Sequence, residues 1–414
     1  MRFNTHLPII IASLLIGENS LSGEKDTISL ADAIANSLKK NPALATFDAD
    51  RRIAEANIIT ARTRPNPELE TEIEDVIGSG DYRGFNSAIY NIGVSQLIET
   101  GRKRQWRTEI AKAEQRTQQL QFDAVRRQVI SETGKRYIDV LTAQEIEQNA
   151  GENYRIAGEA YTTITKQIEE GRGSAIDSGQ ALLGKNEALL SLETTKRETA
   201  LARQRLSAMW AEPKPGFSVV SGKLLRPKAG IPSLDVLYRS IENHPALLLA
   251  GSGVCVAESQ LTLEEKNRKP DVTVGLGYRR DSSIDDNALV LGLSLPIPIF
   301  DKNEGGIAKA DAEIDRRKAL VSQTQTHLEM SIAEARAKLV TAKSEYDLVS
   351  GDMLSAAQDH YNTLKEAYAL GRVQYLNLLE ARRASNAIRK QKLESLGRYH
   401  AARVELESLT GEKF

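Results

Sequence analysis

The chain has 414 residues, of which 27% are charged, 41% hydrophobic and only 5% aromatic, and its 55 Lys and Arg nearly cancel its 56 Asp and Glu. This balance gives no long-range attraction for nucleic acid, and the single cysteine, Cys255, excludes a disulfide framework and a cysteine-based metal site. The low aromatic content, together with abundant Ala, Glu, Gln, Arg and Leu, indicates a mostly helical protein built from long helices.

The N-terminus has the pattern of an export signal. Arg2 precedes an apolar run from Leu7 to Gly17, and Ser20-Leu21-Ser22 then supplies small residues at the spacing that a signal peptidase reads. We expect residues 1–22 to be a signal peptide, and the alternative is a buried N-terminal helix. A membrane-spanning helix is not predicted here, because about 11 apolar residues are too few to span a bilayer. No later segment approaches 18 uncharged apolar residues, so the sequence predicts no transmembrane helix.

The remainder reads as two repeats, residues 28–212 and 233–411, joined by a linker at 213–232 that is rich in proline and glycine. LADAIANSLKKNPAL, which begins at Leu30, is echoed by LDVLYRSIENHPAL, which begins at Leu234. Because an offset of about 200 residues holds along both repeats, we interpret the sequence as an internal duplication.

Each repeat is predicted to contain an opening helix, two strands, a long helix and a shorter returning helix. The opening helices are expected to be about 30 residues long and to end near Arg62 and Asn267. In the first repeat the strands are expected at about 67–98, the long helix at 102–170 and the returning helix at 175–210. In the second repeat the strands are expected at about 270–299, the long helix at 306–370 and the returning helix at 373–409.

The second long helix carries a heptad seam, which requires a partner helix. Spacings of four and three residues join Leu328, Ile332, Ala335, Leu339, Ala342, Tyr346, Val349, Met353 and Ala356. The first long helix has a looser pattern, because Gly134, Gly151 and Gly158 interrupt it.

The strands alternate with period two. Their apolar positions are Leu69, Thr71 and Ile73; Tyr90, Ile92 and Val94; Val272, Val274, Leu276 and Tyr278; and Leu289, Leu291, Leu293 and Leu295. Between the first three stand the glutamates Glu68, Glu70, Glu72 and Glu74.

Two interpretations of this alternation are open. Two solvated hairpins on a helical bundle would show this alternation. Such hairpins need a packed face for stability, but the apolar stripes of the helices are expected to pack against each other and not against the strands. For an exported protein the other partner is outer-membrane lipid, and strands with apolar and polar faces are those of a membrane barrel. Four strands cannot close around a passage, whereas three copies of the chain would supply twelve. The four glutamates would then line the water-filled interior, where an acidic lining favours cations, or lie just below the bilayer where the strand leaves it.

With these features assembled, the sequence resembles the TolC family of trimeric outer-membrane efflux factors. The duplication carries the resemblance, together with the turns Gly171-Arg172 and Gly371-Arg372 and the closing run from Leu370 to Gly411. QLIETGRKR, at Gln96 to Arg104, and LSLPIPIFDKNEGGIAKA, which begins at Leu293, are similar to the heavy-metal branch, the CzcC-like proteins.

The resemblance implies a homotrimer with a twelve-stranded barrel in the outer membrane of a Gram-negative bacterium, continuous with an α-helical coiled-coil tunnel in the periplasm. It implies two protein partners, a periplasmic adaptor (membrane fusion protein) and an inner-membrane pump of the resistance-nodulation-division (RND) type. The tip turns that meet the adaptor would be Gly171, Arg172, Gly371 and Arg372.

The resemblance also places a gate beside the second turn, where relatives carry acidic residues one helical turn apart. Those positions match Asn377 and Glu380 here, and Asp177 is the equivalent in the first repeat. Because Asn377 replaces an acid, a double ring of carboxylates becomes one ring of Glu380 side chains. The alternative role for Glu380 is a solvated side chain paired with Arg383.

No catalytic or cofactor motif is present, and the five histidines are scattered without metal-ligand spacing. The basic cluster GRKRQWR, Gly101 to Arg107, is expected to face water at the periplasmic end of the second strand rather than to bind nucleic acid. We therefore expect a passive outer-membrane conduit for heavy-metal cations and not an enzyme. The alternatives are a multidrug or secretion channel and, from another class, a soluble periplasmic coiled-coil adaptor.

Overall fold

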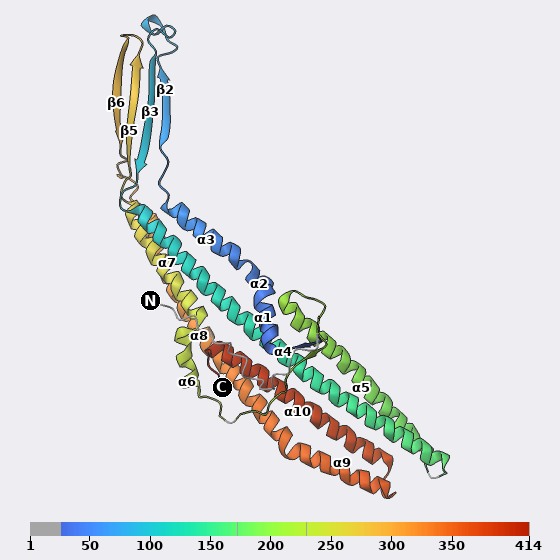
Figure 1. Ribbon diagram of the computed structural model, residues 1–414. Coiled ribbons are helices and arrows are strands. Elements are labelled where there is room, and N and C mark those ends of the chain that lie inside the picture. Colours follow the sequence, from blue (N-terminus) through green and yellow to red (C-terminus); the bar gives the residue numbers. More distant parts are fainter. Residues whose placement is uncertain (1–25, 172, 229, 414) are drawn as a thin grey trace. The chain divides into compact units, whose positions relative to one another are not determined.

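The computed structural model describes residues 26–171, 173–228 and 230–413 (Figure 1). These residues form two compact units, which are described separately below. The helical unit comprises the described parts of residues 1–46, 122–244 and 325–414, and the strand unit comprises residues 47–121 and 245–324. The expected signal peptide, residues 1–22, lies outside the described residues.

Both halves of the chain contain opening helices, two strands, a long helical stretch and a returning helix, in that order. The first half contains β1 (Thr27–Ile28), α1 (Leu30–Lys40), α2 (Pro42–Ala45), α3 (Phe47–Arg62), β2 (Glu68–Glu74), β3 (Ile89–Ile98), α4 (Lys103–Glu169), α5 (Ala175–Ser207) and β4 (Val219–Val220). The second half contains α6 (Leu234–Tyr238), α7 (Pro245–Asn267), β5 (Val272–Asp281), β6 (Asp286–Ser294), α8 (Glu304–Leu348), α9 (Leu354–Ala369) and α10 (Tyr375–Thr410).

The opening helices are not the single helices that the sequence predicted. Each is broken at a Pro-Ala-Leu motif, where Pro42 begins α2 and Pro245 begins α7. Proline has no backbone N–H to continue a helix, but it fits the first turn of a new one. Asn41 stabilises the first break, because its side chain accepts a hydrogen bond from the Ala43 backbone N–H at 2.9 Å.

The predicted heptad seam is confirmed as far as Val349, because its seven members from Leu328 to Val349 are all buried. The continuous second long helix, expected at 306–370, is wrong: a π turn, Val349–Met353, separates α8 from α9. Within it Gly351 has φ −85° and ψ −119°, which lies outside the α and β regions.

The π turn shifts the inward-facing side of the helix by one residue, because each of its hydrogen bonds spans five residues instead of four. Met353 and Ala356, which the seam predicted to be inside, are exposed. Their C-terminal neighbours are partly buried instead, and the seam continues at Leu354, Ala357, Tyr361, Leu364 and Tyr368.

The centre of the helical unit joins α1, α4, α5, α10 and the linker. Tyr137 of α4 is fully buried, and its hydroxyl lies 2.6 Å from the Ser221 carbonyl oxygen and 3.1 Å from that of Ile28. β1 and β4 pair in parallel beside it, and Phe217 and Val220 of the linker are part of the core. The linker at 213–232 is therefore packed structure in part, which its composition did not indicate.

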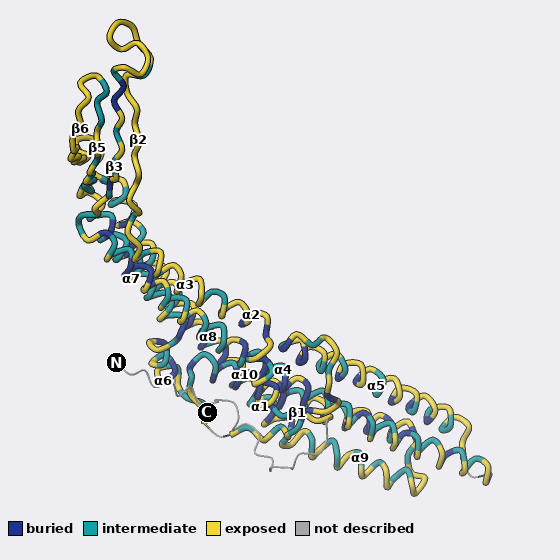
Figure 2. The backbone as a smooth tube through the Cα atoms, turned by 45° about the horizontal axis from the view of Figure 1, so that its top comes forward, coloured by how far each residue is buried: buried dark blue, intermediate teal, exposed yellow. Residues whose placement is uncertain are grey.

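The strand unit holds a four-stranded antiparallel sheet in the order β2-β3-β5-β6 (Figure 1). Its middle contact, between β3 and β5, joins the hairpins of the two halves of the chain over ten residue pairs, from Ile89 opposite Asp281 to Ile98 opposite Val272. β2 and β6 are the edge strands, and every residue of both is exposed (Figure 2).

Helix α7 of the strand unit is long and apolar enough to cross a membrane, and only 11% of its most apolar 18-residue window is buried. The sequence analysis, which counted only uninterrupted apolar residues, did not single out this segment. The helix packs beside α4, where Thr117 Oγ1 lies 3.0 Å from Ser252 Oγ. Pro245, Ala257 and Leu263 of the helix are buried and most of its other residues are partly buried, so only a small part of its apolar surface, including Leu248, is exposed in a single chain.

His400 of α10 is a buried titratable group in the helical unit. The ring is 3% exposed, and its Nε2 lies 2.8 Å from the carbonyl oxygen of Leu225 in the linker. Burial lowers the pKa of His400 to about 4, and the nearby charge of Arg403 acts in the same direction. The neutral ring with a proton on Nε2 is the form that fits this site.

Because the pKa of His400 is lower in the folded than in the unfolded chain, the unfolded chain takes up its proton first as the pH falls. We expect the contribution of His400 to be complete above pH 6.5 and to be lost progressively towards pH 4, with a total of about 3 kcal/mol. Chemical unfolding followed by circular dichroism should show a shallower pH dependence for His400→Gln, whose amide can still donate to Leu225. The exposed His327→Gln is the control, and an equal slope in wild type and His400→Gln would contradict the assignment.

Candidate functional site

The sheet has one apolar and one polar face. The register aligns Leu69, Val94, Leu276 and Leu291 in one row across all four strands. The full apolar face consists of Leu69, Ile73, Tyr90, Ile92, Val94, Val274, Leu276, Tyr278, Leu289, Leu291 and Leu293, and all of these side chains are exposed in the single chain. A contiguous apolar surface of this kind requires lipid or another apolar partner.

The opposite face carries the predicted glutamates, Glu68, Glu70, Glu72 and Glu74. Neighbouring polar side chains on β3 hold two of them, because Ser95 Oγ donates to Glu70 and Asn91 Nδ2 donates to Glu74, both at 2.9 Å. Arg279 of β5 lies on the same face, opposite Asn91. The polar face therefore has a net negative charge concentrated on the edge strand β2.

Glycines occupy the middle of the polar face. Gly93 lies opposite Gly277, and Gly275 lies opposite Gly292. A Cβ on Gly93 would come within 3.3 Å of the Leu276 carbonyl oxygen, and one on Gly277 within 3.3 Å of the Ile92 carbonyl oxygen. Because these glycines have no side chains, the neighbouring strands can approach closely, and no side chains project from the middle of the polar face.

The two predicted tip turns end α4 and α9 with left-handed glycines, Gly171 at φ +75° and Gly371 at φ +70°. At the second turn, Gly371 N–H donates to Tyr368 O and Arg372 N–H donates to Ala367 O, both at 2.9 Å, which is a Schellman motif. Glycine is favoured there because L side chains strain this conformation. Arg372 is exposed, and Arg172 lies outside the described residues.

The predicted gate residues lie next to a small core that joins four helices of the helical unit. Ile164 of α4, Ala181 of α5, and Tyr375 and Leu379 of α10 form its centre, with Tyr368 of α9 beside them. Burial raises the pKa of Tyr368, and the negative charge of Asp177 adds to this shift. Asp177 is thus held against the core by α5.

Asn377 and Glu380 are both exposed on α10, and no described residue forms an ion pair with Glu380. The alternative prediction that Glu380 pairs with Arg383 is wrong. Arg383 instead reaches across to α5, where its Nη2 lies 2.5 Å from Glu187. The structure therefore leaves the Glu380 carboxylate available, while it gives Asp177 a partly buried position.

Two further contacts fix α10 against its neighbours, and the sequence analysis missed both. The buried Arg382 donates to Asn153 of α4 through Nη2 at 2.6 Å and through Nε at 3.1 Å. Gly184 of α5 lies against Leu379, whose Cδ1 would be 2.8 Å from a Cβ at that position. The sequence Glu-Ala-Arg-Arg does not indicate whether Arg382 or Arg383 points into the bundle. A single glycine in a helix, such as Gly184, does not indicate which neighbouring side chain packs against it.

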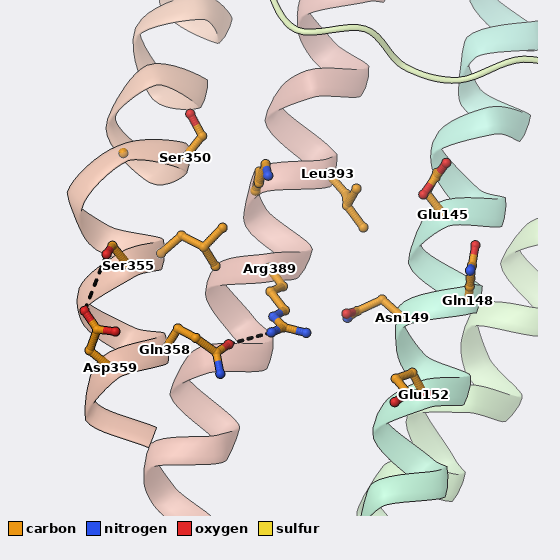
Figure 3. A pocket seen from close by; sticks show the side chains of 13 residues that line it. Glu145, Gln148, Asn149, Glu152, Ser350, Ser355, Gln358, Asp359, Arg389 and Leu393 are labelled. Carbon is orange, nitrogen blue, oxygen red and sulfur yellow. Dashed lines mark hydrogen bonds between the residues drawn. The ribbon is translucent and has the colours of Figure 1, made fainter. Parts of the chain in front are cut away.

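A cavity of about 710 Å³ lies in the helical unit next to the π turn. Figure 3 shows Glu145, Gln148, Asn149 and Glu152 of α4 on one side, with Arg389 and Leu393 of α10 and Ser355 and Asp359 of α9 across from them. The lining mixes both signs of charge. Nowhere among the described residues do three or more His, Cys, Asp or Glu side chains gather so that they could hold a metal ion.

Comparison with known proteins identifies the family. The family described as "Outer membrane efflux protein" matches residues 33–212 and again residues 236–412. The cobalt-zinc-cadmium resistance protein CzcC of Cupriavidus metallidurans is 26% identical over 93% of this chain and 90% of its own length. The nickel and cobalt resistance protein CnrC of the same species is 24% identical over 78% of this chain and 76% of its own length.

Among solved structures, the outer membrane channel MtrE of Neisseria gonorrhoeae, in its open state, has a TM-score of 0.74. The match covers 96% of this chain and 94% of that channel at 17% sequence identity, which establishes a shared fold.

The contact between Gly184 and Leu379 leads to a prediction about the core beside the gate. Gly184→Ala should lower the melting temperature of the helical unit relative to Gly179→Ala, because the added Cβ would lie 2.8 Å from Leu379 Cδ1 and force this buried side chain to shift, a cost of about 1–3 kcal/mol that offsets the gain in helix propensity. Gly179 of the same helix has open space around it, and Gly179→Ala is the control, which helix propensity should stabilise by up to about 1 kcal/mol. Equal melting temperatures for the two variants would show that the close contact is absent in solution.

Proposed function

The chain belongs to the outer membrane efflux protein family, and we propose that it is the outer-membrane channel of a tripartite system that exports heavy-metal cations. Proteins of this family are efflux channels of the Gram-negative outer membrane and not enzymes. The single observation that carries the proposal is the four-stranded sheet with an exposed apolar face and two exposed edge strands.

Trimer formation explains both exposed features of the sheet. In lipid, every backbone N–H and C=O needs a protein partner, so an open edge at β2 or β6 is not tolerated. Four strands cannot close, whereas three copies supply twelve strands, an even number within the range of membrane barrels. In this arrangement β6 of one protomer pairs with β2 of the next, and the apolar face contacts lipid.

The helices support the same assembly. Leu248 of α7 is exposed in the single chain and most other apolar residues of that helix are only partly buried, and neighbouring protomers would cover them in a trimeric tunnel. The chain is an internal duplication of two repeats, residues 28–212 and 233–411, and each repeat contributes one hairpin, one long helix and one shorter helix. The two separate family matches support this division.

The polar face of the sheet would line the barrel interior. Glu68, Glu70, Glu72 and Glu74 then form acidic rings, partly offset by Arg279, and the glycines of the other strands leave the passage open. Fixed negative charges attract cations and repel anions at short range, and salt reduces this effect to a preference.

The tip of the helical unit would carry the gate and the docking surface. Three Glu380 side chains would form a ring when three copies assemble, with Asn377 one turn away, and Asp177 at the equivalent position of the first repeat would support it. Gly171, Arg172, Gly371 and Arg372 would meet the periplasmic adaptor, which couples the channel to an RND pump in the inner membrane. The π turn next to the seam is a natural point at which α9 could move when the tip opens.

Metal cations are the proposed substrates because the relatives CzcC and CnrC are described as cobalt, zinc, cadmium and nickel resistance proteins. The absence of a metal-binding cluster among the described residues fits a conduit that passes ions without retaining them. A drug or secretion channel remains the alternative for the substrate.

A deletion strain tests the substrate assignment. Loss of the protein should lower tolerance to zinc, cobalt, cadmium or nickel, and a plasmid copy should restore it. Parallel assays with several drugs serve as the comparison. Unchanged metal tolerance with reduced drug tolerance would replace the metal assignment with the drug channel.

A charge substitution tests the gate. In planar bilayers, Glu380→Gln should reduce the ratio of cation to anion permeability by about twofold, because it removes three carboxylates from the narrowest ring. Glu366→Gln, at an exposed carboxylate of α9 that is not placed in the gate, is the matched control. Identical ion selectivity in Glu380→Gln and wild type would remove Glu380 from the gate.

A further inference from the structure

A second large cavity lies in the strand unit, where β2 and β3 meet α3 and α4. Its volume is about 940 Å³. The lining is basic and contains Arg62 at the end of α3, Arg64 before β2, and Arg102, Lys103, Arg104 and Lys112 at the beginning of α4. At this cavity the basic cluster GRKRQWR, Gly101 to Arg107, lies next to the C-terminal end of α3.

Four of these cations have no acidic partner. Lys103 is neutralised by Asp271 at 2.8 Å and Lys112 by Glu109 at 2.9 Å. Glu99, the other carboxylate of the lining, is held by Arg107. No ion pair joins the remaining four to any described residue, and these are Arg62, Arg64, Arg102 and Arg104. The cavity therefore collects uncompensated positive charge, which an anionic ligand would neutralise.

The turn that carries Arg102 and precedes Arg104 is held by several hydrogen bonds. Gly101 and Arg102 are both left-handed, at φ +66° and +62°. Thr100 N–H donates to Asp271 at 2.8 Å, and Thr100 Oγ1 donates to the Pro270 carbonyl oxygen at 2.6 Å. Because Asp271 also binds Lys103, one carboxylate fixes both the turn and the first residue of α4. The arginines are thus presented from a fixed backbone.

One wall of the cavity is apolar and continues the lipid-facing side of the sheet. Pro65, Leu97 and Ile98 contribute to the lining. Ile98 is 50% exposed and stands on the same face of β3 as Tyr90, Ile92 and Val94, by the two-residue period of a strand. A ligand with an anionic head and hydrocarbon chains would match both parts of the cavity.

We propose that this cavity binds the phosphate headgroup of an anionic phospholipid, with the acyl chains lying along Ile98 and the apolar face. The inference rests on the proposed barrel, since only an inserted barrel brings this end of the strands to the membrane surface. The helices begin at this end, so the lipid would belong to the leaflet that faces the periplasm. Guanidinium groups suit this ligand because they form bidentate hydrogen bonds with phosphate oxygens.

Native mass spectrometry of the detergent-purified protein tests the proposal. The delipidated wild type is titrated with phosphatidylglycerol and with phosphatidylethanolamine of the same acyl chains. We expect at least about tenfold tighter retention of phosphatidylglycerol, and the quadruple change Arg62→Gln, Arg64→Gln, Arg102→Gln and Arg104→Gln should abolish that preference. The matched control replaces four cations of the linker that form no ion pair with any described residue, namely Lys214, Lys223, Arg226 and Lys228, by Gln.

Three outcomes would overturn the lipid assignment. These are equal retention of the two lipids by the wild type, an undiminished preference in the quadruple variant, and displacement of phosphatidylglycerol by millimolar inorganic phosphate, which would mark a site for free anions. A wild-type protein that conducts ions as a trimer without a lipid preference refutes this inference alone. A wild-type protein that is monomeric without detergent refutes the proposed channel instead.

Discussion

An antiparallel sheet with two unpaired edges and one exposed apolar face is the constraint on which the rest of this structure depends. The backbone groups along the outer sides of β2 and β6 need partners, and the apolar face from Leu69 to Leu293 needs a surface that is not water. Lipid satisfies the face but makes the edges more costly, because it offers no hydrogen bonds. Pairing between copies of the chain resolves both requirements together, and the proposed trimer follows from this more directly than from the helices.

In the proposed channel the helical unit has a different requirement, which is to close the passage and still allow it to open. Its central core is anchored by buried groups such as Tyr137, whereas the core beside the tip is small and depends on Leu379 fitting against Gly184. The π turn at Gly351 lies between these two regions along the α8 and α9 seam. The most adaptable geometry therefore occurs on the tip side of the well-packed centre, where the proposed gate residues are found.

The sequence was informative where one physical pattern dominated. Period-two alternation located the strands and predicted which side chains of each strand share a face, whereas the register that aligns Leu69 with Leu291 in one row is known only from the structure. The heptad spacing predicted the buried seam correctly up to Val349. Beyond that point the sequence already contains a one-residue shift of the seam, because the apolar residues Leu354, Tyr361 and Leu364 each stand one position later than the heptad spacing requires. The inserted residue of the π turn accounts for this shift.

Other features depend on tertiary contacts that a single sequence does not encode locally. The roles of Arg382 and Arg383 differ only because one side chain meets Asn153 inside and the other meets Glu187 at the surface. The Pro-Ala-Leu motifs were recognised as repeats, but they start helices rather than continue them. The four unpaired arginines at the base of the strands became visible only when the ion pairs of Lys103, Lys112 and Arg107 had been assigned.

Disulfide cross-linking between the edge strands tests the central claim most directly. In a Cys255→Ser background, Thr71→Cys in β2 would be combined in turn with Leu289→Cys, Leu291→Cys and Leu293→Cys in β6. Within one chain β3 and β5 separate these positions by about 14 Å, well beyond the reach of a disulfide. Oxidation of intact membranes should link one of the three pairs into covalent trimers, and monomers at every pair would contradict a barrel closed by β6 against β2.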